Sequence, residues 1–112
     1  MKGDLKRAWV KALRGRGYRQ TASRLTIRGN RSIGKRAKYC CLGVLCRVAD
    51  GKFDMTGRAI FPSGNVTSIC TLGIPVLDEL GLSARDADRL MMMNDNQRKS
   101  FKEIADWIET HL

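Results

Sequence analysis

The chain has 112 residues, of which 43% are hydrophobic and 29% are charged. These proportions exclude a disordered or collagen-like chain, and the length allows one hydrophobic core rather than two. The longest nearly apolar stretch, residues 39–46, has eight residues, whereas a transmembrane helix needs roughly 20. The N-terminus has no export-signal pattern, so we expect a single cytoplasmic domain over residues 1–112 with no membrane partner.

Positive charge is concentrated in the N-terminal third. Residues 1–38 hold thirteen Lys or Arg and one acid, a net charge of +12, whereas residues 39–112 have a net charge of −2. Arg outnumbers Lys by seven to one in residues 14–36, and guanidinium groups bind phosphates bidentately. This imbalance predicts an anionic partner for the N-terminal third, while a merely solubilising surface is the alternative that charge alone leaves open.

The first predicted element is an amphipathic helix near the N-terminus. Its apolar positions recur at helical spacing and are Leu5, Ala8, Trp9, Ala12 and Leu13. Asp4 stands at the expected N-cap, and Gly15 follows the last apolar position. The opposite face is cationic and carries Lys6, Arg7, Lys11 and Arg14. One stripe should therefore pack on the core while the other stays in solvent.

A basic β-hairpin is expected next, because residues 24–28 alternate polar and apolar side chains. Gly29-Asn30 suits a two-residue loop with the glycine at positive φ. In that register two pairs of cations face each other across the ladder: Arg28 with Arg31, and Arg24 with Lys35. Like charges directly opposite destabilise a sheet by up to about 1 kcal/mol, so a bound anion would stabilise this face.

Residues 39–49 are apolar nearly all round and predict a buried central helix. A buried strand is the alternative, since periodicity alone does not assign a short apolar run. The eleven-residue length, with Gly51 as the C′ residue, favours the helix. Gly43 costs a helix about 1 kcal/mol relative to Ala, so we expect another backbone to approach closely there.

Turn-forming residues dominate residues 53–68 and predict a short hairpin or an irregular loop. A short helix is expected over residues 75–80. Pro75 suits its first position, and Gly81 ends it.

Two further helices follow in the C-terminal part. Ser83 with Asp86 resembles a capping box and opens a helix through Met93, which the polar residues 94–96 break. Its predicted inner face is Ala84, Ala87, Leu90 and Met91. Ser100 with Glu103 forms a stronger capping box for the last helix. The apolar stripe of that helix is Phe101, Ile104, Ala105, Ile108 and Leu112, with Trp107 at its edge.

These elements together predict an α+β, helix-rich single domain. A buried, Cys-rich central helix is surrounded by amphipathic N- and C-terminal helices, with the basic hairpin at one side.

The four cysteines are Cys40, Cys41, Cys46 and Cys70, and no C-x2-C pair is present. In a helix Cys40 and Cys41 point about 100° apart, so they do not converge with Cys46 on one ion. Buried free thiols in a reducing compartment are the favoured interpretation. A zinc site, a disulfide and a reactive thiol are the alternatives, and we expect no metal and no cofactor.

Catalytic patterns are weak, so we expect no enzyme and no catalytic residue. His111 is the only histidine and is the second-last residue of the sequence. Asp95 begins a sequence that lacks the glycine and the distal glutamate of a calcium loop. Gly15-Arg16-Gly17 has no following helix signature and is not a phosphate loop.

The predicted site is therefore a phosphate-binding patch. Its cationic members are Arg14, Arg16, Arg19, Arg24, Arg28, Arg31, Lys35, Arg36 and Lys38, and Tyr18 and Tyr39 are possible stacking surfaces. The expected ligand is nucleic acid or a nucleotide, with a cyclic-nucleotide sponge as a variant. The alternative is a protein inhibitor, anti-CRISPR-like, that docks the same patch on an acidic host or defence protein.

Three segments, residues 9–20, 39–46 and 93–109, resemble small uncharacterised proteins encoded by bacteriophages and prophages. The most specific is Cys-Cys-Leu-Gly-Val-Leu-Cys at residues 40–46. The resemblance covers nearly the whole chain, but between Thr21 and Lys38 this sequence is longer and more basic. It implies a phage accessory protein that acts in the host cytoplasm, in counter-defence or host takeover, and it carries over no catalytic residue.

Overall fold

A computed structural model describes residues 1–29 and 36–112. The described elements, in chain order, are α1 (Gly3–Arg14), β1 (Arg19–Gln20), β2 (Thr26–Ile27), β3 (Lys38–Tyr39), α2 (Cys41–Val48), β4 (Lys52–Phe53), β5 (Ala59–Ile60), α3 (Ile74–Leu80), α4 (Ala84–Asp95) and α5 (Phe101–His111). The predicted helix-rich α+β class is confirmed. No helix in the described part of the chain is long and apolar enough to cross a bilayer.

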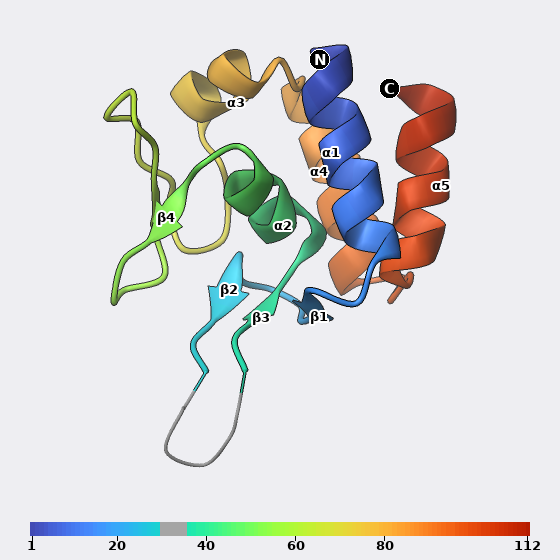
Figure 1. The fold of residues 1–112 in the computed structure, drawn as a ribbon, viewed down its shortest axis with the longest axis horizontal. Helices are drawn as coiled ribbons and strands as arrows, with labels where there is room; N and C mark the ends of the chain where they lie inside the picture. The colour runs from blue at the N-terminus through green and yellow to red at the C-terminus, as the bar shows by residue number, and fades with distance from the viewer. Residues whose placement is uncertain (30–35) are drawn as a thin grey trace.

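Helix α2 lies in the middle of the fold, between the other helices and the short strands (Figure 1). Helices α1 and α5 run side by side with the two chain ends at the same end of the molecule (Figure 1), and α4 packs against α2 and α5. Residues 41–46 are all buried. An apolar surface all round a helix requires cover on every side, which explains this central position.

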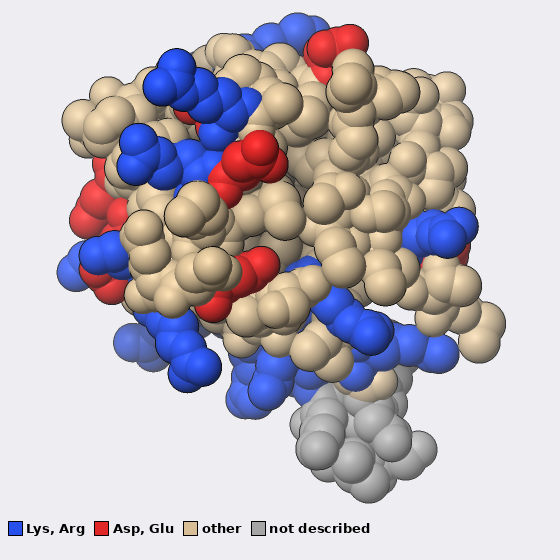
Figure 2. Space-filling view, turned by 180° about the vertical axis from the view of Figure 1, so that it is seen from behind, with Lys and Arg blue, Asp and Glu red and all other residues tan. Residues whose placement is uncertain are grey.

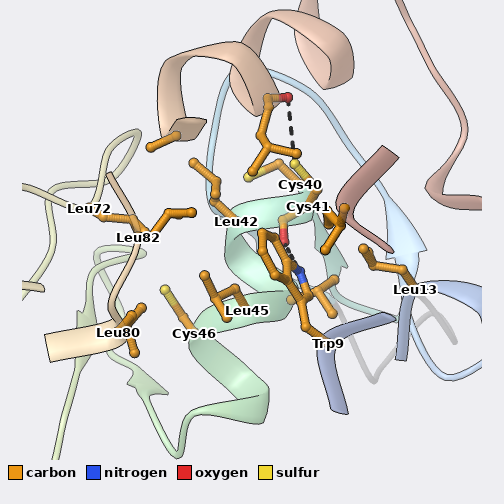
Figure 3. Packing of buried hydrophobic residues seen from close by; sticks show 14 of the residues in the cluster. Trp9, Leu13, Cys40, Cys41, Leu42, Leu45, Cys46, Leu72, Leu80 and Leu82 are labelled. Carbon is orange, nitrogen blue, oxygen red and sulfur yellow. Dashed lines mark hydrogen bonds between the residues drawn. The ribbon is translucent and has the colours of Figure 1, made fainter. Parts of the chain in front are cut away.

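Trp9 ties α1 to α2 inside the core. Its indole is fully buried, and Nε1 donates to the carbonyl oxygen of Cys41 at 2.9 Å (Figure 3). The Cys41 thiol in turn donates to the carbonyl oxygen of Leu90 in α4 at 3.6 Å. A buried indole N–H needs an acceptor, so these contacts orient α1, α2 and α4 relative to one another.

Helix α1 forms as predicted, but two details differ. The N-cap is Lys2, which makes no side-chain cap, and Asp4 lies in the first turn, where it pairs with Arg7. Ala8 is exposed, whereas Val10 is buried. Because α5 packs along α1, the buried stripe includes Val10, which the periodicity of α1 alone did not single out.

Both ends of α2 differ from the prediction. The helix begins at Cys41, because Tyr39 belongs to β3 and Cys40 is the N-cap, with its sulfur accepting from the Gly43 N–H at 3.4 Å. At the other end Asp50, rather than Gly51, takes the left-handed conformation, with φ of 67°. Gly51 is needed for space instead, since a Cβ there would lie 2.8 Å from the Cys46 carbonyl oxygen.

The hairpin prediction was right in kind and wrong in register. β3 is the central strand, parallel to β1 and antiparallel to β2, with Ile27 opposite Lys38. A loop at Gly29-Asn30 would put Ile27 opposite Ser32, so the predicted register is wrong, and Arg28 lies beyond the paired residues. Asn30 itself lies outside the described residues. Arg31, the predicted partner of Arg28, and Lys35, the predicted partner of Arg24, lie outside the described residues.

The register has a physical cause outside the loop. The Cys40 N–H donates to the Leu25 carbonyl oxygen at 3.1 Å, and the Leu25 side chain is fully buried. This contact holds the two chain segments in place against α2 and fixes their register.

The C-terminal half largely follows the prediction. β4 and β5 form a short hairpin, the first of the two alternatives predicted there, with Gly57 at φ of 91° in its loop. Gly81 ends α3 in the left-handed conformation, and the Ser100–Glu103 capping box is present. Helix α4, however, continues to Asp95, two residues past Met93, the predicted end.

Candidate functional site

The three-stranded sheet places two cations side by side. Arg19 in β1 is the direct partner of Lys38 in β3, and Lys38 also pairs with Ile27 in β2. Directly opposed residues share one face of a sheet, and all three side chains are exposed. The register thus makes Arg19 and Lys38 a directly opposed pair of like charges.

A groove of about 680 Å³ lies between β2 and the β4–β5 hairpin. Its apolar lining comes from Ile27, Phe53 and Met55, and Arg24 and Arg28 supply its positive charge. Ile27 is 43% exposed and Met55 is 79% exposed. The groove therefore presents apolar surface to water next to two guanidinium groups.

The groove also contains one carboxylate, Asp54. Its Oδ1 accepts from the Thr56 hydroxyl at 2.6 Å, the Thr56 N–H at 2.8 Å and the Arg58 N–H at 3.1 Å. The Thr56 hydroxyl bond, followed by the Arg58 backbone bond, lowers the pKa of Asp54. Asp54 is therefore a charged acceptor that also shapes the hairpin loop.

A second hollow, of about 360 Å³, adjoins the first. It brings Arg36, which precedes β3, together with Arg47 of α2 and with Tyr18 and Tyr39. Ala37 lines both hollows. Arg47 was not among the predicted site residues, although it is the one charged residue within residues 39–49 and a cation in such a segment has to reach solvent.

An aromatic row connects the two hollows. The Tyr18 and Tyr39 rings meet edge to face with centroids 5.3 Å apart, and the Tyr39 and Phe53 rings are tilted with centroids 5.8 Å apart. Both tyrosines are only half-buried. The predicted stacking pair therefore belongs to a longer aromatic row that ends in the first groove.

The structure separates Arg14 from the other predicted cations. Arg14 pairs with Asp106 at 2.8 Å and with Glu109 at 2.5 Å, and these hydrogen bonds raise its pKa. It joins α1 to α5 at a different groove, also lined by Lys11 and Leu112. Arg16 is exposed just after α1, next to Gly17 of the second hollow.

We use the term basic surface for six described residues: Arg19, Arg24, Arg28, Arg36, Lys38 and Arg47. Lys and Arg side chains gather along the lower edge of the molecule in Figure 2, whereas a large part of the same view carries no charge.

Three of the predicted thiols are buried and Cys70 is half-buried, and all four are free. Burial raises the pKa of Cys40 to about 11 and also raises the pKa of Cys41 and Cys46. These thiols stay protonated at neutral pH and are poor nucleophiles. His111 stacks on Trp107, with ring centroids 4.6 Å apart. Across residues 1–29 and 36–112, no group of three or more His, Cys, Asp and Glu could hold a metal ion.

The fold and this site define a small α+β domain with a cationic, aromatic-lined face. The chain belongs to the family described as a domain of unknown function, DUF8296, whose model matches residues 1–57. The matched segment contains every residue of the basic surface and of the aromatic row. No curated protein and no solved structure matches the chain.

Proposed function

We propose that this protein is a non-enzymatic binding protein for a phosphate-rich ligand, nucleic acid or nucleotide, which it holds on the basic surface. The observation that carries the proposal is the pair of adjoining hollows, each with two arginines, that share Ala37. The described residues lining them include one acid, Asp54, which already accepts hydrogen bonds from its own loop. The charge around both hollows is thus strongly positive.

Phosphate would relieve a repulsion that the free protein carries. Arg19 and Lys38 are direct neighbours across the sheet, where like charges are destabilising. A polyanion that pairs with both exchanges this repulsion for attraction and releases its own counterions. In the phage setting that the sequence resemblance implies, the protein would act by sequestering or masking such a ligand in the host cell.

Substitutions that neutralise the two arginines of the first groove test the proposal. We expect Arg24→Gln/Arg28→Gln to weaken binding of labelled RNA, DNA or inorganic polyphosphate at least about tenfold, because a charge-assisted hydrogen bond contributes about 1.5 to 3 kcal/mol. The matched control is Arg85→Gln/Arg89→Gln, which removes two exposed arginines of α4 outside both hollows. Fluorescence anisotropy at two salt concentrations measures both.

Wild type and control should bind equally, and their affinity should fall steeply with salt. If wild type binds none of the nucleic acids, nucleotides or polyphosphate, the proposal is wrong and an acidic protein partner replaces it. Equal binding by all three proteins would remove the first groove from the site.

A further inference from the structure

We infer that the ligand of the basic surface is a single-stranded nucleic acid, whose unpaired bases occupy the two hollows while its phosphates pair with the surrounding cations. This inference rests on the function proposed above and names the form of the ligand, which charge alone does not distinguish.

The apolar floor of the first groove points to a base. Ile27 and Met55 expose apolar surface beside Arg24 and Arg28. Phosphate alone would cover none of this surface, and a duplex keeps its bases stacked inside while it presents its backbone. An unpaired base has a flat face that suits such a floor, next to a cation for the phosphate that follows it.

Asp54 favours the same orientation. Its carboxylate lies at the groove and repels phosphate, so the phosphates belong on the arginine side. A carboxylate also accepts hydrogen bonds from the exocyclic amino groups that bases carry. The groove therefore separates a position for a base from a position for a phosphate.

Continuity between the hollows indicates a polymer. Ala37 lines both hollows, and Tyr39 contacts Tyr18 on one side and Phe53 on the other. Each hollow has its own pair of arginines, so successive phosphates would find partners along the whole path. A mononucleotide fills one hollow, whereas a strand of several nucleotides fills both. Cations tracking a backbone beside aromatic rings are typical of single-strand binding.

The test compares probes that share phosphates and differ in bases. They are a labelled single-stranded oligonucleotide, as RNA and as DNA, its duplex, an abasic oligonucleotide of the same length, and a mononucleotide. At equal salt we expect the single strand to bind at least about tenfold more tightly than the other three. Its log–log salt slope should fall by about 0.7 for each phosphate contact removed.

Neutral substitutions in the groove floor isolate the contribution of the bases. Phe53→Leu keeps apolar volume but removes the ring, and Met55→Ala removes an exposed side chain. We expect each to weaken single-strand binding, Phe53→Leu at least about fivefold, and to leave binding of the abasic strand unchanged. Met92→Ala is the control, because Met92 is 52% exposed on α4 and lines neither hollow.

The outcomes separate the inference from the proposed function. If the duplex, the abasic strand or the mononucleotide binds as tightly as the single strand, or if Phe53→Leu binds like wild type, the inference is wrong while phosphate binding stands. If the protein binds none of the probes, both are wrong.

Discussion

The backbone of Leu25 shows how one residue positions the site. Its N–H donates to the Ile69 carbonyl oxygen at 2.9 Å, and its own carbonyl oxygen accepts from the Cys40 N–H at 3.1 Å. A Cβ on Gly43 would lie 2.8 Å from the Leu25 carbonyl carbon and still closer to its oxygen. The missing side chain at Gly43 thus lets the segment that carries Arg24 pack directly on α2.

Gly43→Ala should therefore destabilise the protein strongly. The new methyl group meets backbone rather than a side chain that can move away, so we expect a loss of about 3 kcal/mol in the free energy of unfolding. Urea denaturation measures this loss. Gly17→Ala is the control, because no atom lies within 4 Å of a Cβ built there. A loss under about 1 kcal/mol for Gly43→Ala would mean that the Leu25 segment shifts readily.

At the scale of elements, β3 organises the basic surface. It pairs with β1 and β2, it places Lys38 beside Arg19, and the residues just before it supply Arg36 and Ala37. Alternation in residues 24–28 predicted β2, because a half-buried strand needs that pattern. It did not predict β3, since Tyr39 was assigned to the central helix. The register in which β2 pairs with β3 was not predictable from the Gly29-Asn30 dipeptide, since it follows from how Leu25 and Cys40 pack against α2.

Lys38→Gln should separate stability from binding. Removing one of two like charges on adjacent strands should raise the unfolding free energy by a few tenths to about 1 kcal/mol. Removing a proposed phosphate partner should also weaken binding of the ligand. The free energy of unfolding and the binding affinity should therefore change in opposite directions. Thermal denaturation and anisotropy of the same samples measure both.

Lys102→Gln, on the exposed face of α5, is the matched control and should change neither quantity. A Lys38→Gln protein that is less stable than wild type would show that Arg19 and Lys38 do not repel each other appreciably.

At the scale of the whole molecule, Asn94 joins elements far apart in the chain. Its Oδ1 accepts from the Gln20 side chain at 3.0 Å and the Cys41 N–H at 3.2 Å, and its Nδ2 donates to the Thr21 carbonyl oxygen at 2.8 Å. Asn94 was predicted to lie in a loop that breaks a helix, whereas it is buried within α4. The side-chain amide of Asn94 makes these hydrogen bonds, and the sequence alone does not identify their partners.

Asn94→Ala should lower the unfolding free energy by about 2 to 3 kcal/mol, because it leaves buried backbone and side-chain groups without partners. It should also loosen β1 relative to α2, which hydrogen exchange at the Cys41 amide would detect as faster exchange. Asn96→Ala changes an exposed residue of the same type nearby and should be close to neutral. Equal stability of the two variants would contradict the role of Asn94.

The sequence by itself determined the helices, the caps at Gly81, Ser83 and Ser100, and the buried Cys-rich centre. Periodicity, capping residues and an all-apolar segment are local signals of backbone conformation and burial. It also determined that the N-terminal third is cationic. Only the tertiary structure decided which cations lie together. It paired Arg14 with α5, brought Arg47 of α2 beside Arg36, and placed Phe53 and Met55 beside Arg24 and Arg28. These groupings depend on strand register and on contacts between distant segments, which hydrophobic pattern and charge count do not encode.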